Sequence, residues 1–269
     1  MIIKSGPLGK ITGYPSIYNK SLLFCIDRST ERRYYDVTNK QLFNGYDVWN
    51  AYELSWIRKD GRPNIAVAEI IYSCQSKYII ESKSLKLYLN SFSGSIFESC
   101  DHVTNTIKKD LSSRLEINVK VRLIDVNKKI TSYIPEGDNI DHSYQQNFHF
   151  FGINTSKTIY VKNKTLYSHL LRSNCPVTMQ PDWGTIIIHY SGLKIDQTTL
   201  LGYIISLRTI SEFQEQCIER IYMKILTRCK PDSLEVFGRY TRRGGIDINP
   251  YRSSHDTSHI YKNLRTFRQ

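Results

Sequence analysis

Residues 211–231, SEFQEQCIERIYMKILTRCKP, carry the helix signal on which the interpretation of the fold rests. From Ile218 to Ile225 the apolar residues follow the i, i+3, i+4, i+7 spacing that gathers them on one helix face. Acidic residues near the start of the segment and basic residues near its end both suit the helix dipole. We therefore predict an amphipathic helix that starts near Ser211 and stops at Pro231.

The elements around this helix repeat an order that also occurs earlier in the chain. In the second half, Thr185–Tyr190 is a β-branched strand, Asp196 is placed to cap a helix to about Leu207, and Leu234–Tyr240 is a strand. In the first half, strands are predicted at 48–57, 64–72 and 117–126, and helices at 84–92 and 103–115. Both halves are read as strand, strand, helix, helix, strand, which predicts a duplicated α+β unit.

The predicted boundaries follow from this repeat. They are an irregular N-terminal extension at 1–45, a first unit at 46–130, a connection rich in turn residues at 131–164, a second unit at 165–253, and a basic tail at 254–269 that runs over the surface.

The composition favours a cytoplasmic protein with a packed core. Of the 269 residues, 40% are apolar and 23% charged, and no run of about 18 apolar residues indicates a membrane span. No apolar segment follows the first lysines, so no secretory signal is predicted. The six cysteines include no CxxC pair, which argues against a thiolate zinc site and for reduced thiols.

The net charge of +12 raises the alternative of an RNA-binding module. Its charges are dispersed, however, and lack the interleaved aromatic residues of an RNA-binding platform. A solvated basic surface is the favoured interpretation.

Two strings have the composition of anion-binding sites. Residues 81–92, ESKSLKLYLNSF, open a helix whose N-terminus and lysines suit a phosphate, although Glu81 could equally be a capping residue. Residues 242–250, RRGGIDINP, pair arginines with glycines, so guanidinium groups and bare backbone can approach an anion together. A strand end with a glycine turn explains the second string as well.

A third string, residues 173–184, SNCPVTMQPDWG, contains a candidate nucleophile. Cys175 lies in a polar, turn-forming stretch, and Asp182 is close enough in sequence to serve as its acid–base partner. A buried cysteine and a surface aspartate form the alternative, which the residue types alone leave open.

Together and in this order, the three strings resemble the NADPH-dependent 7-cyano-7-deazaguanine reductases, the QueF family, in its longer two-domain type. The segments 49–56 (WNAYELSW), 215–220 (EQCIER) and 239–241 (RYT) also fit, and the resemblance covers roughly residues 45–253. It implies two tandem tunnelling-fold (T-fold) units, a homodimer, NADPH as cosubstrate, no metal, no direct contact with nucleic acid, and a place in queuosine biosynthesis.

The resemblance also implies roles for individual residues. Cys175 would attack the nitrile carbon to form a thioimide, and Asp182 would protonate the nitrogen. The substrate-binding positions are Ile80, Glu81, Ser82, Gln214 and Glu215. The NADPH-binding positions are Ser82, Lys83, Arg243 and Gly244.

One residue departs from the family pattern. The family has His-Glu after the phenylalanine, whereas this chain has Gln214-Glu215 after Phe213. Glutamine can hydrogen-bond but cannot titrate. We hypothesise an active but slowed enzyme; the alternative is a deazapurine-binding protein whose catalysis is impaired.

Overall fold

The computed structural model describes residues 6–7, 9–32, 43–143, 152–256 and 263–269. By its contacts the chain divides into two compact units. Unit 1 contains residues 1–32, 46–130 and 242–248, and unit 2 contains 33–45, 131–241 and 249–269.

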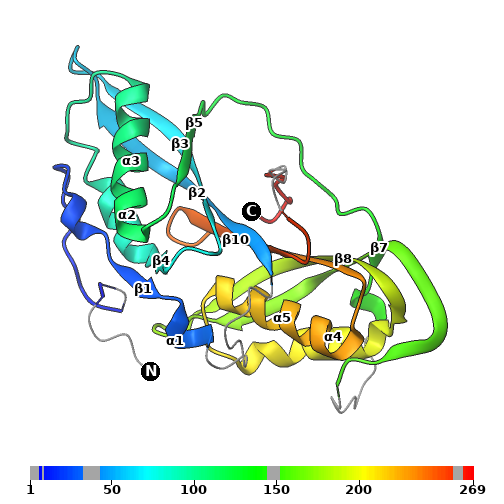
Figure 1. The fold of residues 1–269 in the computed structure, drawn as a ribbon. Helices are drawn as coiled ribbons and strands as arrows, with labels where there is room; N and C mark the ends of the chain where they lie inside the picture. Colours follow the sequence, from blue (N-terminus) through cyan, green and yellow to red (C-terminus); the bar gives the residue numbers. More distant parts are fainter. Residues whose placement is uncertain (1–5, 8, 33–42, 144–151, 257–262) are drawn as a thin grey trace. The chain divides into compact units, whose positions relative to one another are not determined.

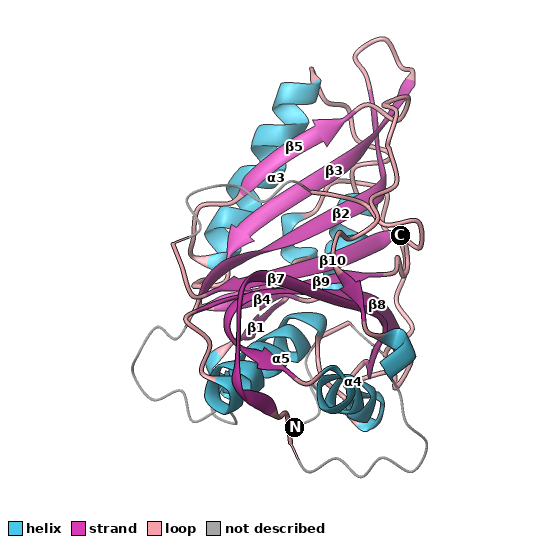
Figure 2. Ribbon diagram, turned by 90° about the vertical axis from the view of Figure 1, so that its right-hand side faces the viewer, coloured by secondary structure: helices cyan, strands magenta, loops and turns pink. Residues whose placement is uncertain are grey.

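Unit 1 is an antiparallel sheet packed against two helices. Its elements are β2 (Asn44–Ile57), β3 (Pro63–Ser73), β4 (Tyr78–Ile80), α2 (Ser82–Asn90), α3 (Cys100–Leu115) and β5 (Lys120–Ile124). The strand order is β5-β3-β2, followed by the start of β10 (Ile246–Ser253). Both helices lie on the same face of these strands (Figures 1 and 2).

The core of unit 1 lies between these layers. Helix α3 buries one residue per turn, Val103, Ile107, Leu111 and Leu115. Strand β2 contributes Trp49 and Trp56, both of which are 1% exposed. The Ser99 hydroxyl accepts the His102 N–H at 3.1 Å, which caps α3 at its first turn.

Residues 9–32 belong to unit 1 and form short regular elements, whereas an irregular extension was predicted there. Leu23 lies in the core, and the Tyr18 hydroxyl donates to Asp110 Oδ2 at 2.6 Å. The elements here are too short to show a periodic pattern, which is why the sequence did not reveal them. They are a 3₁₀-helix at Lys20–Leu22, β1 (Cys25–Asp27), which pairs with β4, and α1 (Ser29–Arg32).

Unit 2 repeats this order of elements. It consists of β6 (Asp138–Asn139), β7 (Thr155–Asn174), β8 (Pro181–Ile195), α4 (Gln197–Ser206), α5 (Gln214–Cys229) and β9 (Ser233–Tyr240), with 3₁₀-helices at Asp141–Ser143 and Leu207–Thr209. The strand order from the end of β10 is β10-β9-β8-β7-β6, antiparallel except for β6. Helices α4 and α5 cover one face (Figure 1). The α+β class is thus confirmed, with α2 and α3 packed on the sheet of unit 1 and α4 and α5 on that of unit 2.

The helices of unit 2 agree with the sequence signals. Asp196 caps α4, accepting the Thr199 N–H at 2.7 Å. Helix α5 ends at Cys229, and Lys230 adopts a left-handed conformation (φ 48°) just before Pro231. The helix begins at Gln214, three residues after the predicted start, because Ile210–Glu212 is extended and pairs with the end of β7.

Besides the short strands β1, β4 and β6, two long strands were not predicted from the sequence. Strand β7 begins at Thr155, inside the segment predicted as a connection, because its first half is polar and exposed and shows no clear alternation. Strand β10 was read only as part of a glycine-containing string.

The tail also differs from the prediction. Gln269 is 8% exposed, and its amide donates to the Tyr240 carbonyl at 3.1 Å and to Asn249 Oδ1 at 2.7 Å. The end of the tail therefore packs against unit 2 instead of running over the surface. Parts of the predicted extension, connection and tail, at 1–5, 8, 33–42, 144–151 and 257–262, lie outside the described residues.

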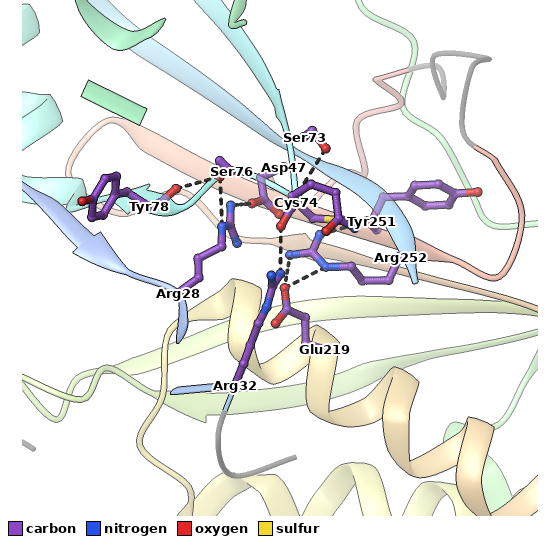
Figure 3. Close-up of polar contacts among 11 residues, drawn as sticks. Arg28, Arg32, Asp47, Ser73, Cys74, Ser76, Tyr78, Glu219, Tyr251 and Arg252 are labelled. Atoms are coloured by element: carbon purple, nitrogen blue, oxygen red, sulfur yellow. Dashed lines mark hydrogen bonds and ion pairs between the residues drawn. The ribbon is translucent and has the colours of Figure 1, made fainter. Parts of the chain in front are cut away.

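Each unit contains a buried ion pair (Figure 3). In unit 1, Arg28 Nη2 lies 2.5 Å from Asp47 Oδ2. In unit 2, Arg252 Nε and Nη2 donate to Glu219 Oε1 at 3.0 and 2.8 Å, which ties β10 to α5. Within the described residues, no helix is both long and apolar enough to span a membrane.

Candidate active site

Cys175 stands where β7 ends and the loop to β8 begins. Its N–H donates to the Gln180 carbonyl at 2.8 Å, and its own carbonyl accepts the Met179 N–H at 3.1 Å. The first bond extends the strand pairing one step beyond the pair formed by Asn174 and Pro181, and the second closes the turn. The cysteine side chain is 1% exposed, so it is held in a defined and largely desolvated position.

Asp182 lies on the same face of this hairpin as Cys175. It pairs with Ser173, and side chains alternate along a strand, so Ser173, Cys175 and Asp182 point to one side. Cys175 and Asp182 are diagonal neighbours, a relation that separates residues by roughly 7–8 Å or less. Asp182 is 6% exposed, so the alternative of a surface aspartate is wrong.

Further polar groups are buried around Asp182. Burial, followed by the Cys217 thiol and the Asp182 carboxylate, holds the pKa of Tyr240 well above its usual value. Burial also raises the pKa of the Cys217 thiol, while contacts with the hydroxyls of Tyr240 and Ser173 oppose that shift. Sequence reasoning did not assign a place to Ser173, Cys217 or Tyr240, although each lies in or beside a quoted string.

Gln214 and Glu215 are the first two residues of α5, and both are buried, at 9% and 2% exposure. The Gln216 side chain accepts the Phe213 N–H at 2.9 Å and so closes the start of the helix. The segment before α5 pairs with the end of β7. Within unit 2 it therefore connects the hairpin that carries Cys175 to the start of α5.

In unit 1, Glu81 is the N-cap of α2. Its carboxylate accepts the N–H groups of Lys83 at 2.6 Å and Ser84 at 2.9 Å, and it is fully buried. Burial raises its pKa, and these two bonds oppose the shift. The capping interpretation is thus right. A phosphate was expected to bind free N–H groups at this helix start. That expectation is wrong for the N–H groups of Lys83 and Ser84, because both donate to the Glu81 carboxylate.

The glycine string forms a tight turn. The Arg243 N–H donates to Ile246 O at 2.9 Å, and Gly244 and Gly245 have φ of 61° and 79°. Positive φ at both central residues matches a type I′ turn and explains the two glycines. A Cβ at Gly244 would lie 3.6 Å from Lys86 Nζ, so the turn comes up against α2.

Unit 1 therefore brings two strings together that are far apart in the sequence. The exposed backbone of Gly244 lies beside the Lys86 ammonium, with Lys83 on the same helix and Arg243 on the same turn. Bare backbone and cations suit the phosphates of a dinucleotide such as NADPH. Ile80 and Glu81 are buried, whereas Ser82 and Lys83 are half-buried at the start of α2.

A metal site was not expected, and the described residues contain no group of three or more His, Cys, Asp or Glu side chains that could hold a metal ion.

Comparison with known proteins points to the same family as the three sequence strings. Residues 14–123 match the family described as "Nitrile reductase, 7-cyano-7-deazaguanine-reductase N-term", and residues 181–259 match the "QueF-like protein" family.

Full-length relatives extend the match. An NADPH-dependent 7-cyano-7-deazaguanine reductase of Coxiella burnetii is 47% identical over 97% of this chain and 96% of its own length. Reductases of the same name from Desulfotalea psychrophila and Burkholderia multivorans are 45% and 44% identical, each over 98% of this chain and 97% and 98% of their own. The chain belongs to the family of NADPH-dependent 7-cyano-7-deazaguanine reductases.

Proposed function

We propose that this chain reduces the nitrile of 7-cyano-7-deazaguanine to the aminomethyl group, through a thioimide on Cys175 and with two NADPH per turnover. The observation that carries the proposal is the buried pair of Cys175 and Asp182 on one face of the β7–β8 hairpin. The full-length relatives with this activity in their names support it.

Covalent addition makes the nitrile reducible. Cys175 Sγ bonds to the nitrile carbon, one bond of the C≡N group breaks, and the nitrogen takes up a proton, which leaves a C=N bond. Asp182 is the proton donor in this step. Because both side chains are almost completely shielded from solvent, water does not compete for the thioimide.

The substrate base is held at the start of α5. The Glu215 carboxylate accepts two hydrogen bonds from the N1–H and 2-amino edge of the deazaguanine, a bidentate fit. Gln214 contributes a neutral hydrogen bond beside it. The family resemblance makes Ile80, Glu81 and Ser82 a second substrate-binding stretch.

Two NADPH, bound in turn, would each supply one hydride, the first to the C=N bond of the thioimide and the second to the imine left once Cys175 is released as thiolate. Ser82, Lys83, Arg243 and Gly244 would hold NADPH. The cations and the bare turn beside Lys86 are suited to its phosphates.

We also propose that the enzyme acts as a homodimer in the cytoplasm, in queuosine biosynthesis, on a free small molecule without direct contact with nucleic acid. The family resemblance supports this setting.

The experiment is NADPH oxidation by the purified protein with 7-cyano-7-deazaguanine, beside Cys175→Ala. We expect two NADPH consumed per nitrile in the wild type and none in the variant. Equal oxidation in both would rule out the thioimide route. The second candidate, a binding protein with impaired catalysis, is favoured by Gln214 alone and predicts a Cys175 adduct without NADPH oxidation.

A further inference from the structure

Asn174, the residue before Cys175, joins the nucleophile hairpin to the segment that leads into α5. Its N–H donates to the Ile210 carbonyl at 2.9 Å, and its carbonyl accepts the Glu212 N–H at 3.0 Å. Two backbone bonds therefore pair the last residue of β7 with the segment just before Gln214 and Glu215.

The same backbone pairing occurs in unit 1. The Ile57 N–H donates to the Ser95 carbonyl at 2.9 Å, and the Ile57 carbonyl accepts the Phe97 N–H at 2.9 Å. Ile57 ends β2 as Asn174 ends β7, and both pair in parallel with the segment between the two helices of their unit. The backbone bonds are therefore a feature of the repeated fold and need no catalytic reason.

The side chain distinguishes the two positions. Asn174 Nδ2 donates to the Arg208 carbonyl at 2.9 Å, and Oδ1 accepts Arg172 Nη2 at 3.2 Å. Asn174 is 8% exposed, so both bonds are shielded from water. Isoleucine at position 57 can form neither bond.

The residues around Asn174 make this connection stiff. The guanidinium carbons of Arg172 and Arg208 lie 5.2 and 5.7 Å from the centre of the Trp183 ring, which immediately follows Asp182. On the other side, the Glu212 carboxylate accepts Arg220 Nε at 2.8 and 3.1 Å, which fixes the segment to α5 itself.

We propose that the Asn174 side chain is a positioning residue that sets Cys175 relative to the start of α5, where the base is bound. The inference rests on the proposed function. Its chemical reason is that covalent addition needs the Cys175 sulfur at near-attack distance from a nitrile whose base is held by Glu215. A displacement of about 1 Å can cost on the order of 10²-fold in rate.

The test compares Asn174→Ala and Asn174→Asp with the wild type in two measurements. The first is the rate of adduct formation with 7-cyano-7-deazaguanine in the absence of NADPH, followed by rapid quenching and intact-protein mass spectrometry. The second is the affinity for the 7-aminomethyl product by calorimetry, because that molecule presents the same base without a nitrile. Ile57→Ala, at the equivalent position of unit 1, is the matched control.

We expect both Asn174 variants to slow adduct formation by tenfold or more, toward the order of 10²-fold, with product affinity within about twofold of wild type. Ile57→Ala should change neither quantity by more than about twofold. Asn174→Asp keeps the shape of the side chain but replaces the donor to Arg208 by an acceptor, so it tests the bond even where the alanine variant does not fold.

Two outcomes overturn the inference alone: unchanged addition rates in both variants, or rate and product affinity falling in the same proportion, as a general loss of folded protein would give. Absence of any adduct in the wild type would overturn the proposed function, and this inference with it.

Discussion

The β2–β3 hairpin of unit 1 and the β7–β8 hairpin of unit 2 share one backbone bond beyond their last strand pair, but their loops differ in length and in surroundings. The Arg58 N–H donates to Arg62 O at 2.9 Å, as the Cys175 N–H donates to Gln180 O at 2.8 Å. The turn of unit 1 is charged and exposed, with the Arg62 side chain 73% exposed, whereas Cys175 is 1% exposed. The same place in the strand pairing is thus an exposed turn in unit 1 and the buried position of the proposed nucleophile in unit 2.

The strand register shows which residues of the two hairpins correspond. The pair Ile57 and Pro63 corresponds to the pair Asn174 and Pro181. Arg58 then stands at the position of Cys175, and Asn64 at that of Asp182. The proposed covalent step therefore depends on two side chains, Cys175 and Asp182, that have no counterpart in unit 1, and exchange of equivalent residues tests it directly.

The largest expected effect is on the proton donor. Asp182→Asn removes the carboxyl group but keeps its shape, and we expect turnover to fall by about 10²–10⁴-fold. Asn64→Asp, at the equivalent position of unit 1, should leave turnover within about twofold. Steady-state NADPH oxidation measures both, and similar turnover in Asp182→Asn and Asn64→Asp would break the comparison.

The next effect concerns stability. Glu219→Ala leaves the Arg252 guanidinium buried without its carboxylate, and breaking a buried pair costs about 3–5 kcal/mol. Asp47→Ala should destabilise the protein similarly through Arg28 in unit 1. Urea unfolding followed by circular dichroism gives the midpoints. The control is Glu98→Ala, which removes the exposed pair with Lys59 and should leave the midpoint unchanged; a Glu219→Ala midpoint equal to that of the control would be the contrary result.

A smaller effect is expected at the residue that departs from the family pattern. Gln214→His restores a group that titrates near pH 6.5, and we expect turnover to rise by up to about tenfold. If the imidazolium acts as acid, the gain is present below its pKa and is lost as pH rises through it. A pH profile of turnover from wild type and variant measures this, and an unchanged or lower rate in Gln214→His would contradict the hypothesis.

The smallest expected effect is a difference in alkylation between two cysteines, one at the start of α3 and one in the first turn of α5. Cys100 opens α3 and is exposed, whereas Cys217 in the first turn of α5 is fully buried, and burial raises the pKa of its thiol. Because only the thiolate is alkylated, iodoacetamide at about pH 8 should label Cys100 in the folded protein and leave Cys217 unlabelled until unfolding. Peptide mass mapping reads out both, and early labelling of Cys217 would show that its burial is wrong.

These differences also show what could be predicted from the sequence. Helices α4 and α5 were predictable because burial on one side imposes a period of 3.6 residues and because Asp196 and Pro231 mark their ends. The first half of β7 was not predictable, because its exposed polar residues show no alternation of apolar and polar side chains. The duplication was predictable from the repeated order of elements, because each unit needs its own helices to cover one face of its sheet.

The candidate site was predictable in composition but not in arrangement. Residue types and motif resemblance suggested Cys175, Asp182 and the glycine turn. That Gly244 lies against Lys86 depends on long-range packing and leaves no periodic trace in the chain. The cap that Glu81 forms on its own helix is a local contact, which the sequence offered as one of two interpretations.

The most direct test of the central claim, that Cys175 at the buried end of the second hairpin is the nucleophile, is mass spectrometry of the protein incubated with 7-cyano-7-deazaguanine without NADPH. We predict one adduct of the substrate mass, located on the peptide that contains Cys175, absent in Cys175→Ala and present in Arg58→Ala. An adduct that persists in Cys175→Ala, or that maps to another cysteine, would contradict the account.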